Sequence, residues 1–276
     1  MATYGFIGSG HIVEMLLTGL LSREGAEPPR FLCSDVSEER RSRVAERFGV
    51  RTTADNEQVL RESGVVVLAV RPQDAAGLLR SLAGRVPPGR LVISVMAAVP
   101  LAALGLLGER VPVVRMAPNP PAQVRTAITA LAPNRWVTPE QMESAQDLAA
   151  SLGRVMVTTE EKLDVILALF SPAPVFLFVE SLVEAGVRAG LTAEESELVV
   201  KQATCGCMKM WDESKASASE LRSRACTPGG ISVEMLDVLE RGGVPGAIAE
   251  CVRAGVEKGA RLARTVVAAL APGGAA

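Results

Sequence analysis

Residues 3–21 constrain the fold of this chain more than any other segment. Residues 3–7 have the composition of a short buried strand, Gly8-Ser9-Gly10 follows at once, and an apolar helical run extends from Ile12 to Leu21. A strand, a glycine turn and a helix in this order form the phosphate cradle of a dinucleotide-binding fold. The glycines allow the backbone to approach a pyrophosphate, and the free N–H groups at the helix start point at that anion. The third small-residue position of this fingerprint holds Val13, so other segments must support the hypothesis.

The segments that follow alternate between predicted strands and predicted helices up to about residue 158. Val65–Val70 is a continuous apolar run, which is typical of a central parallel strand buried on both faces. Thr138-Pro139-Glu140-Gln141 predicts a helix start, with a threonine cap and a glutamine that completes a capping box. The predicted strands are 3–7, 30–34, 51–53, 65–70, 90–95, 113–115, 127–131 and 155–157. This alternation predicts an α/β, Rossmann-like doubly wound sheet with right-handed crossovers.

The pattern changes near Glu160, because from there on apolar residues recur at helical spacing and no segment has the pattern of a strand. We therefore predict a dinucleotide-binding domain over residues 1–158 and an all-helical domain over residues 159–276. Some of these helices, such as the one containing Val175–Val179 and Leu182, are apolar nearly all round and must be covered on every side. We predict a homodimer through the C-terminal helices and leave a higher oligomer open.

Composition and charge argue against several classes of protein. The net charge is −2 with no long basic run, which argues against nucleic acid as the main partner. The five cysteines include no CxxC pair, so we expect free thiols in the cytoplasm and no metal site. The uncharged runs Leu91–Gly108 and Val165–Val179 are both interrupted by prolines. We interpret them as a strand with a short helix and as a buried helix, and we expect neither a membrane span nor a signal peptide.

The residue types available for catalysis are few. His11 is the only histidine and Tyr4 the only tyrosine, which argues against a Ser-His-Asp or Cys-His mechanism. The chemistry must then come mainly from a cofactor, with the protein supplying binding and orientation.

Two loops have an unusual composition. Arg115–Ala122 leaves the carboxyl end of a predicted strand and contains three prolines around Asn119, at the edge where doubly wound folds bind ligands. Arg224–Val233 carries a Pro-Gly-Gly sequence before a helix. Such a turn exposes N–H groups suited to an anion such as a carboxylate.

Several motifs occur in an order that resembles one known family. Phe6–Gly10, Ala69–Gln73, Arg115–Ala122, Leu221–Gly230 and Leu239–Gly243 are similar to five successive motifs of the pyrroline-5-carboxylate reductases. The resemblance covers nearly the whole chain. It implies an imine reductase of proline biosynthesis, which transfers hydride from NADPH or NADH to the C=N bond of 1-pyrroline-5-carboxylate and forms L-proline.

The resemblance also implies which residues form the site. Ser232 would hydrogen-bond the ring nitrogen of the cyclic imino acid and is the expected catalytic residue. The implied substrate contacts, at the dimer interface, are Ser171, Thr227, Gly229, Gly230 and Ile231. The implied cofactor contacts are Ile7, Gly8, Ser9, Gly10, His11, Ile12, Ser34, Asp35, Asn56, Ala69, Val70, Arg71, Pro72 and Asn119.

Asp35 leaves the cofactor preference open. In one interpretation, its carboxylate binds the adenosine ribose and favours NADH. In the other, Asp35 only precedes the next helix, and Arg40 or Arg41 nearby accepts the 2′-phosphate of NADPH. The family resemblance favours NADPH.

Three alternative functions remain. In the segment Leu167–Pro174 both glycines of the family pattern are replaced, which favours a cyclic imine reductase of a specialised pathway with a modified substrate. A hydroxy-acid dehydrogenase would need an acid–base residue, for which Lys162 and Lys201 are the candidates. A non-catalytic cofactor-binding protein is the third alternative.

Overall fold

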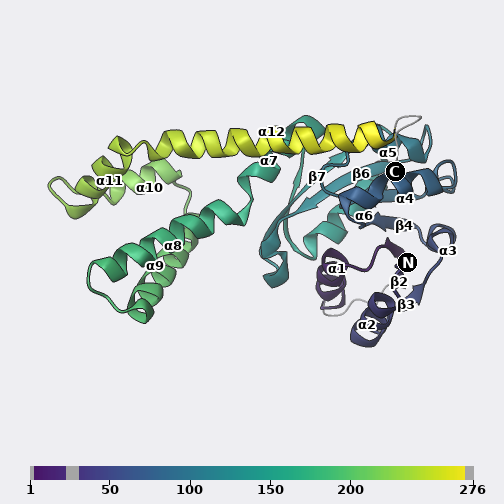
Figure 1. Ribbon diagram of the computed structural model, residues 1–276, viewed down its shortest axis with the longest axis horizontal. Coiled ribbons are helices and arrows are strands. Elements are labelled where there is room, and N and C mark those ends of the chain that lie inside the picture. Colours follow the sequence, from purple (N-terminus) through teal and green to yellow (C-terminus); the bar gives the residue numbers. More distant parts are fainter. Residues whose placement is uncertain (1–2, 23–30, 271–276) are drawn as a thin grey trace. The chain divides into compact units, whose positions relative to one another are not determined.

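The computed structural model describes residues 3–22 and 31–270. The chain divides into two compact units, one formed by Met1–Phe170 with Ala254–Ala276 and the other by Ser171–Arg253. We call them the sheet unit and the helical unit, and Figure 1 shows the elements of each.

One eight-stranded sheet forms the centre of the sheet unit, in the order β3-β2-β1-β4-β5-β6-β7-β8 (Figure 1). The chain first winds outward from β1 to β3 and then returns to β4 on the other side of β1. This reversal confirms the predicted doubly wound α/β sheet. Arg30, predicted to begin the second strand, lies outside the described residues. The strands are β1 (Tyr4–Ile7), β2 (Phe31–Ser34), β3 (Arg51–Thr53), β4 (Val65–Leu68), β5 (Leu91–Ser94), β6 (Val113–Pro118), β7 (Ala127–Pro133) and β8 (Gly153–Val157).

The pair β6 and β7 is antiparallel, whereas each of the other neighbouring pairs is parallel. The connection between the two strands contains only the short 3-10 helix η3 (Pro120–Val124). A parallel crossover needs about a dozen residues or more, so this short connection forces β7 to run back beside β6.

Helices cover both faces of the sheet. The side chains of Phe6 and Val67 pack with α1, α2 and α6 on one face, and those of Ile7 and Val66 pack with α3, α4 and α5 on the other. These elements are α1 (His11–Leu21), α2 (Glu38–Phe48), α3 (Asn56–Glu62), η1 (Pro72–Asp74), α4 (Ala75–Leu82), α5 (Leu101–Leu104), η2 (Gly105–Leu107) and α6 (Pro139–Ala150).

One helix and part of another beyond the predicted boundary belong to the sheet unit. In α7 (Glu160–Leu169), the buried Leu163 packs against Ala130 and Ala132 of β7. Near the end of α12 (Val244–Leu270), Val266 is buried in the same core cluster as α4 and α5. The structure therefore places the division after Phe170 and returns the end of the chain to the sheet unit, instead of dividing the chain at 158 and 159.

The helical unit consists of α8 (Pro172–Arg188), α9 (Ala193–Glu213), α10 (Ala218–Arg224), α11 (Ile231–Arg241) and the first part of α12. Where α8 meets α9, the hydroxyl of Ser196 donates to the Val183 carbonyl at 2.8 Å. Gly186 allows this approach, because a Cβ there would overlap Ser196 Oγ. Among the described residues no strand follows Val157, so this all-helical character agrees with the prediction.

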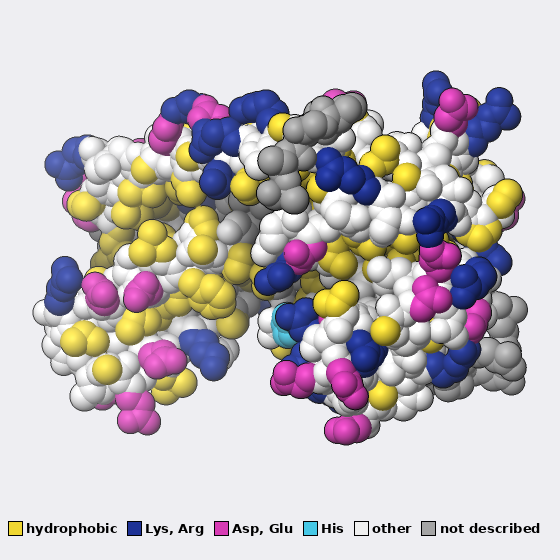
Figure 2. All heavy atoms as spheres, turned by 45° about the vertical axis from the view of Figure 1, so that its right-hand side comes forward, with side chains coloured by type: hydrophobic (Ala, Val, Ile, Leu, Met, Phe, Trp, Pro, Cys, Tyr) yellow, Lys and Arg dark blue, Asp and Glu magenta, His cyan; other side chains and the backbone are white. Residues whose placement is uncertain are grey.

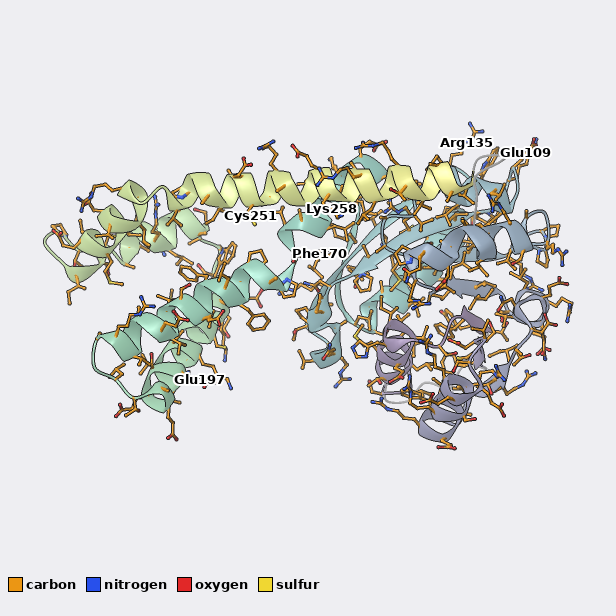
Figure 3. All side chains as sticks on the ribbon, in the orientation of Figure 1. Glu109, Arg135, Phe170, Glu197, Cys251 and Lys258 are labelled. Carbon is orange, nitrogen blue, oxygen red and sulfur yellow. The ribbon has the colours of Figure 1, made fainter. Side chains whose placement is uncertain are left out.

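The apolar run Val165–Val179 is not the buried helix that we expected. It spans two helices, since α7 ends at Leu169, beside Phe170 (Figure 3), and α8 begins at Pro172. The prolines lie in the first turn of α8, where no intrahelical N–H bond is lost. Phe176 is 69% exposed in the single chain. Hydrophobic side chains gather on the surface of the helical unit (Figure 2). By length and composition alone, Glu160–Arg188 is apolar enough to cross a membrane, so this surface needs a covering.

Candidate active site

A cleft of about 570 Å³ lies at the carboxyl ends of β1, β2 and β4. This is the switch point at which open α/β sheets bind their ligands. Of the predicted cofactor residues, it is lined by Ile7, Gly8, Gly10, His11, Asp35, Asn56, Ala69, Val70 and Arg71.

The glycine turn has the geometry of a phosphate cradle. Gly8 has φ +98°, and a Cβ there would lie 2.6 Å from the carbonyl oxygen of Ala69, so only glycine fits. Gly10 caps α1, and a Cβ at Gly10 would meet no atom within 4 Å. The space beside Gly10 at the start of α1 is therefore open, as an approaching pyrophosphate requires. The residues present fit a dinucleotide.

Asp35 holds this turn in place. Its Oδ2 accepts the N–H of Ser9 at 2.9 Å and its Oδ1 accepts the N–H of Ser37 at 2.9 Å. The side chain of Asp35 is only 5% exposed. Ser9 is itself buried, and its hydroxyl donates to the Ser34 carbonyl at 3.2 Å. The Ser9 side chain therefore supports the turn from behind and does not line the cleft.

Four other predicted cofactor residues also lie outside the lining of the cleft. The buried Ser34 donates its hydroxyl to Asn56 Oδ1 at 2.7 Å and so orients a residue that does line it. Ile12 packs against the core, and Pro72 begins η1 after Arg71. Asn119 lies in the loop after β6.

Further lining residues were not among the predicted contacts. Helix α2 contributes Arg40 and Arg43, and the segment Asp74–Ser81 lines the cleft through η1 and α4. Asp74, Leu78 and Ser81 recur at helical spacing, which is a signal for one helix face; only the fold shows that this face meets the cleft. Arg40 was expected only as a ligand of the 2′-phosphate of NADPH, and the lining residues missed altogether are Val36, Arg43, Asp74, Gly77, Leu78 and Ser81.

The asparagine loop is tied to β7 and to the glycine turn. Asn119 Oδ1 accepts the N–H of Ile128 at 3.0 Å, so this end of the side chain has a structural role. In the 3-10 helix that follows, Gln123 Nε2 lies 3.1 Å from His11 Nε2. His11 thereby joins the start of α1 to the loop that carries Asn119.

The Pro-Gly-Gly segment of the helical unit forms a tight turn. The N–H of Gly230 donates to the Thr227 carbonyl at 2.9 Å, and Gly229 has φ +71°. Pro228 before a glycine with positive φ is the signature of a type II turn. A Cβ at Gly230 would overlap Thr227 Oγ1. The turn leads directly into α11, so it presents helix-start N–H groups next to the Thr227 hydroxyl.

Ser232 follows in the first turn of α11, next to the exposed Ile231. No side-chain hydrogen bond caps this helix, and Ser232 is half-buried. Its hydroxyl is therefore not used to cap the helix start. Ser171, also predicted to contact substrate, is the residue before α8, and its side chain likewise caps no N–H group.

Metal-ligating side chains and the two candidate acid–base lysines are the remaining groups that bear on the chemistry. Among the residues that the structure describes, no group of histidine, cysteine and acidic side chains could hold a metal ion. The five cysteines are free thiols, and burial raises the pKa of Cys33 to about 12. Lys162 lies on α7 of the sheet unit and Lys201 on α9 of the helical unit.

A doubly wound sheet with a glycine turn and a cleft at its switch point is typical of a dinucleotide-binding protein. Residues 3–98 match the family model described as "NADP oxidoreductase coenzyme F420-dependent", and residues 160–262 match "Pyrroline-5-carboxylate reductase dimerisation". The pyrroline-5-carboxylate reductase of Corynebacterium melassecola is 31% identical over 96% of this chain and 100% of its own length. The chain belongs to the pyrroline-5-carboxylate reductase family.

Solved structures agree with this assignment. A pyrroline-5-carboxylate reductase from Coxiella burnetii superimposes with a TM-score of 0.88 at 31% identity, covering 95% of this chain and 98% of the other. The Plasmodium falciparum pyrroline carboxylate reductase, solved with NADP bound, has a TM-score of 0.82 at 24% identity over 95% of this chain and 98% of its own. This second likeness supports the fold.

Proposed function

We propose that this protein reduces 1-pyrroline-5-carboxylate to L-proline with NADPH or NADH. The observation that carries the proposal is the family relationship, which extends over 96% of the chain and so includes both the cleft and the Pro-Gly-Gly turn.

The cleft of the sheet unit is the proposed cofactor site. The N–H groups at the start of α1 hold the pyrophosphate, with Gly10 leaving room for it. Asn56 and Ala69–Arg71 line the same cleft and position the remainder of the dinucleotide. When bound, the nicotinamide supplies a hydride from C4 to the carbon of the substrate's C=N bond.

The turn of the helical unit is the proposed substrate site. N–H groups after Gly229 and Gly230 and the Thr227 hydroxyl bind the substrate carboxylate, and the Ser232 hydroxyl hydrogen-bonds the ring nitrogen. A protonated cyclic imine is already electrophilic, so the protein needs no strong base. Placement of the two reactants contributes roughly 7–11 kcal/mol to lowering such barriers. A well-placed hydrogen bond to the reacting group contributes about 3–4 kcal/mol.

The proposed working form is a homodimer in the cytoplasm. The match of residues 160–262 to a dimerisation model and the exposure of Val175, Phe176 and Leu177 support a second copy of the chain as the covering of the helical unit. The free thiols of all five cysteines suit a reducing compartment. We propose neither a nucleic-acid nor a membrane partner.

Turnover of reduced cofactor with 1-pyrroline-5-carboxylate tests the proposal. Ser232→Ala is expected to lower kcat by about 10²–10³-fold, because one hydrogen bond to the reacting group is lost, while Ser232→Thr retains activity. Ser223→Ala is the matched control, since the Ser223 hydroxyl donates to the Ser219 carbonyl within α10. A wild-type kcat for Ser232→Ala would reject the assigned role.

A panel of five- and six-membered cyclic imines tests the substrate. Preference for a six-membered or substituted ring would favour the specialised imine reductase, to which the altered segment Leu167–Pro174 points. Oxidation of a hydroxy acid that is lost in Lys162→Ala would instead support a dehydrogenase.

A further inference from the structure

We propose that Arg40 and Arg43 select the cofactor through the 2′-phosphate of NADPH, and that Asp35 is a positioning residue for the phosphate turn and not a ligand of the adenosine ribose. This inference rests on the proposed use of a dinucleotide but not on the identity of the imine.

The Asp35 carboxylate is already committed within the protein. Both of its oxygens accept backbone N–H groups, from Ser9 in the glycine turn and from Ser37 at the start of α2, each at 2.9 Å. With a side-chain exposure of 5%, the carboxylate offers little surface to ribose hydroxyls. An acid that binds a ribose has to direct its oxygens at the ligand.

Arg41 is committed as well. Its Nη1 donates to the carbonyl of Asp35 at 2.7 Å and approaches that of Val36 at 3.3 Å. The guanidinium therefore holds the loop between β2 and α2 in its bend. This removes one of the two arginines that the sequence offered as phosphate ligands.

Arg40 and Arg43 lie one helical turn apart on α2 and line the cleft. Their side chains are 46% and 51% exposed. Arg40 lies 3.7 Å from Asp35 Oδ2 and Arg43 pairs with Glu14 at 3.2 Å. Both guanidinium groups thus carry positive charge at the β2 end of the cleft, where the adenosine ribose lies in this fold. Arginine offers several donors to one phosphate.

Two nucleotide fragments separate this inference from the reaction. Adenosine 2′,5′-bisphosphate and adenosine 5′-monophosphate differ only in the 2′-phosphate, and calorimetry at fixed salt measures their affinities for the full-length protein. We expect the bisphosphate to bind at least about tenfold more tightly than the monophosphate, because one charge-assisted hydrogen bond to the 2′-phosphate contributes that much affinity. Arg40→Gln and Arg43→Gln should each remove most of this difference and leave the monophosphate within about twofold of wild type.

Arg47→Gln is the matched control. Arg47 is on the same helix, is 58% exposed and pairs with Glu14 at 2.8 Å, yet it does not line this cleft. It should leave the affinity for both fragments unchanged. If Arg40→Gln, Arg43→Gln and Arg47→Gln all lost the same amount of bisphosphate affinity, the effect would be one of general charge and the assignment would be overturned. Equal affinity of the wild-type protein for the two fragments would also overturn it.

Asp35→Asn tests the positioning role. An amide oxygen can replace only one carboxylate oxygen, so one N–H loses its partner and the turn loosens. We expect both fragments to lose affinity by the same factor and the melting temperature to fall. A ribose-binding aspartate predicts the opposite pattern, weaker monophosphate and stronger bisphosphate binding, and that result overturns the inference. Should Asp35→Asn fail to fold, Asp35→Glu, which displaces the carboxylate, is judged by the same criterion.

The fragments lack a nicotinamide, so the two proposals fail separately. Selective fragment binding without turnover rejects the imine reduction alone. Turnover without a difference between the fragments rejects the role of the arginines alone.

Discussion

Alanine at either glycine of the phosphate turn should weaken cofactor binding, but only alanine at Gly8 should also cost much stability. At Gly8, a methyl group would lie 2.6 Å from the Ala69 carbonyl oxygen, on a backbone with φ +98°. The left-handed conformation alone costs about 1–2 kcal/mol for alanine, and the overlap with the Ala69 backbone just after β4 adds a cost of similar size. We therefore expect Gly8→Ala to lower the free energy of unfolding by about 3 kcal/mol and to abolish cofactor binding.

Gly10→Ala is the matched comparison, because its methyl group would meet no atom within 4 Å. Alanine is a poorer N-cap residue than glycine by about 0.5–1 kcal/mol, so stability should stay within about 1 kcal/mol of wild type. The same methyl group occupies the approach of the pyrophosphate, and NADPH affinity should fall by at least about tenfold, or about 1.4 kcal/mol.

Urea unfolding at one protomer concentration and NADPH titration measure the two effects. Wild-type NADPH affinity in Gly10→Ala would refute the placement of the pyrophosphate at this turn. A Gly8→Ala protein as stable as wild type would refute the steric argument.

Three further predictions concern the sheet unit. Glu160→Ala should lower the free energy of unfolding by about 3 kcal/mol, because Glu160 Oε1 accepts hydrogen bonds from Arg115 Nη1 and from the N–H of Leu101, each at 2.7 Å. Urea denaturation measures this loss, with Glu161→Ala as the control. A loss of less than about 0.5 kcal/mol contradicts the prediction. Thr129→Val should stabilise by about 1 kcal/mol, since the buried Thr129 hydroxyl has no partner; a lower melting temperature contradicts it. Cys33, whose pKa burial raises to about 12, should react with a thiol reagent near neutral pH only after unfolding; labelling of Cys33 in the native protein contradicts it.

The sequence was sufficient for a central strand such as β4 because it is a continuous apolar run. Val65–Leu68 has a buried side chain at every position, as such a run predicts for a strand that is covered on both faces. The glycine turn was equally accessible, because Gly8 has a backbone conformation that other residues rarely adopt. The direction of β7 was not predicted, although the length of the preceding connection carries that information.

The site was less accessible because it depends on contacts between distant segments. The N–H of Ser9 donates a hydrogen bond to the Asp35 carboxylate, and this contact cannot be predicted from the identities of the two residues. Arg40 and Arg41 are adjacent in sequence, yet a rotation of about 100° per helical residue places one in the cleft and turns the other to the loop.

The boundaries of the two units could not be predicted from the sequence either, because they also depend on contacts between distant segments. The apolar faces of α7 and α8 look alike in sequence, but Leu163 packs on β7 whereas Phe176 stays exposed in the single chain. Hydrophobic periodicity shows that a helix face needs a partner and does not show which surface provides it.

Transfer of deuterium from C4-labelled NADPH to 1-pyrroline-5-carboxylate tests the central claim most directly. Mass spectrometry of the product should show proline with one deuterium at the ring carbon of the former C=N bond, and a rate that falls in Ser232→Ala. Consumption of labelled cofactor without deuterium in proline, or no consumption with any cyclic imine, would contradict the account.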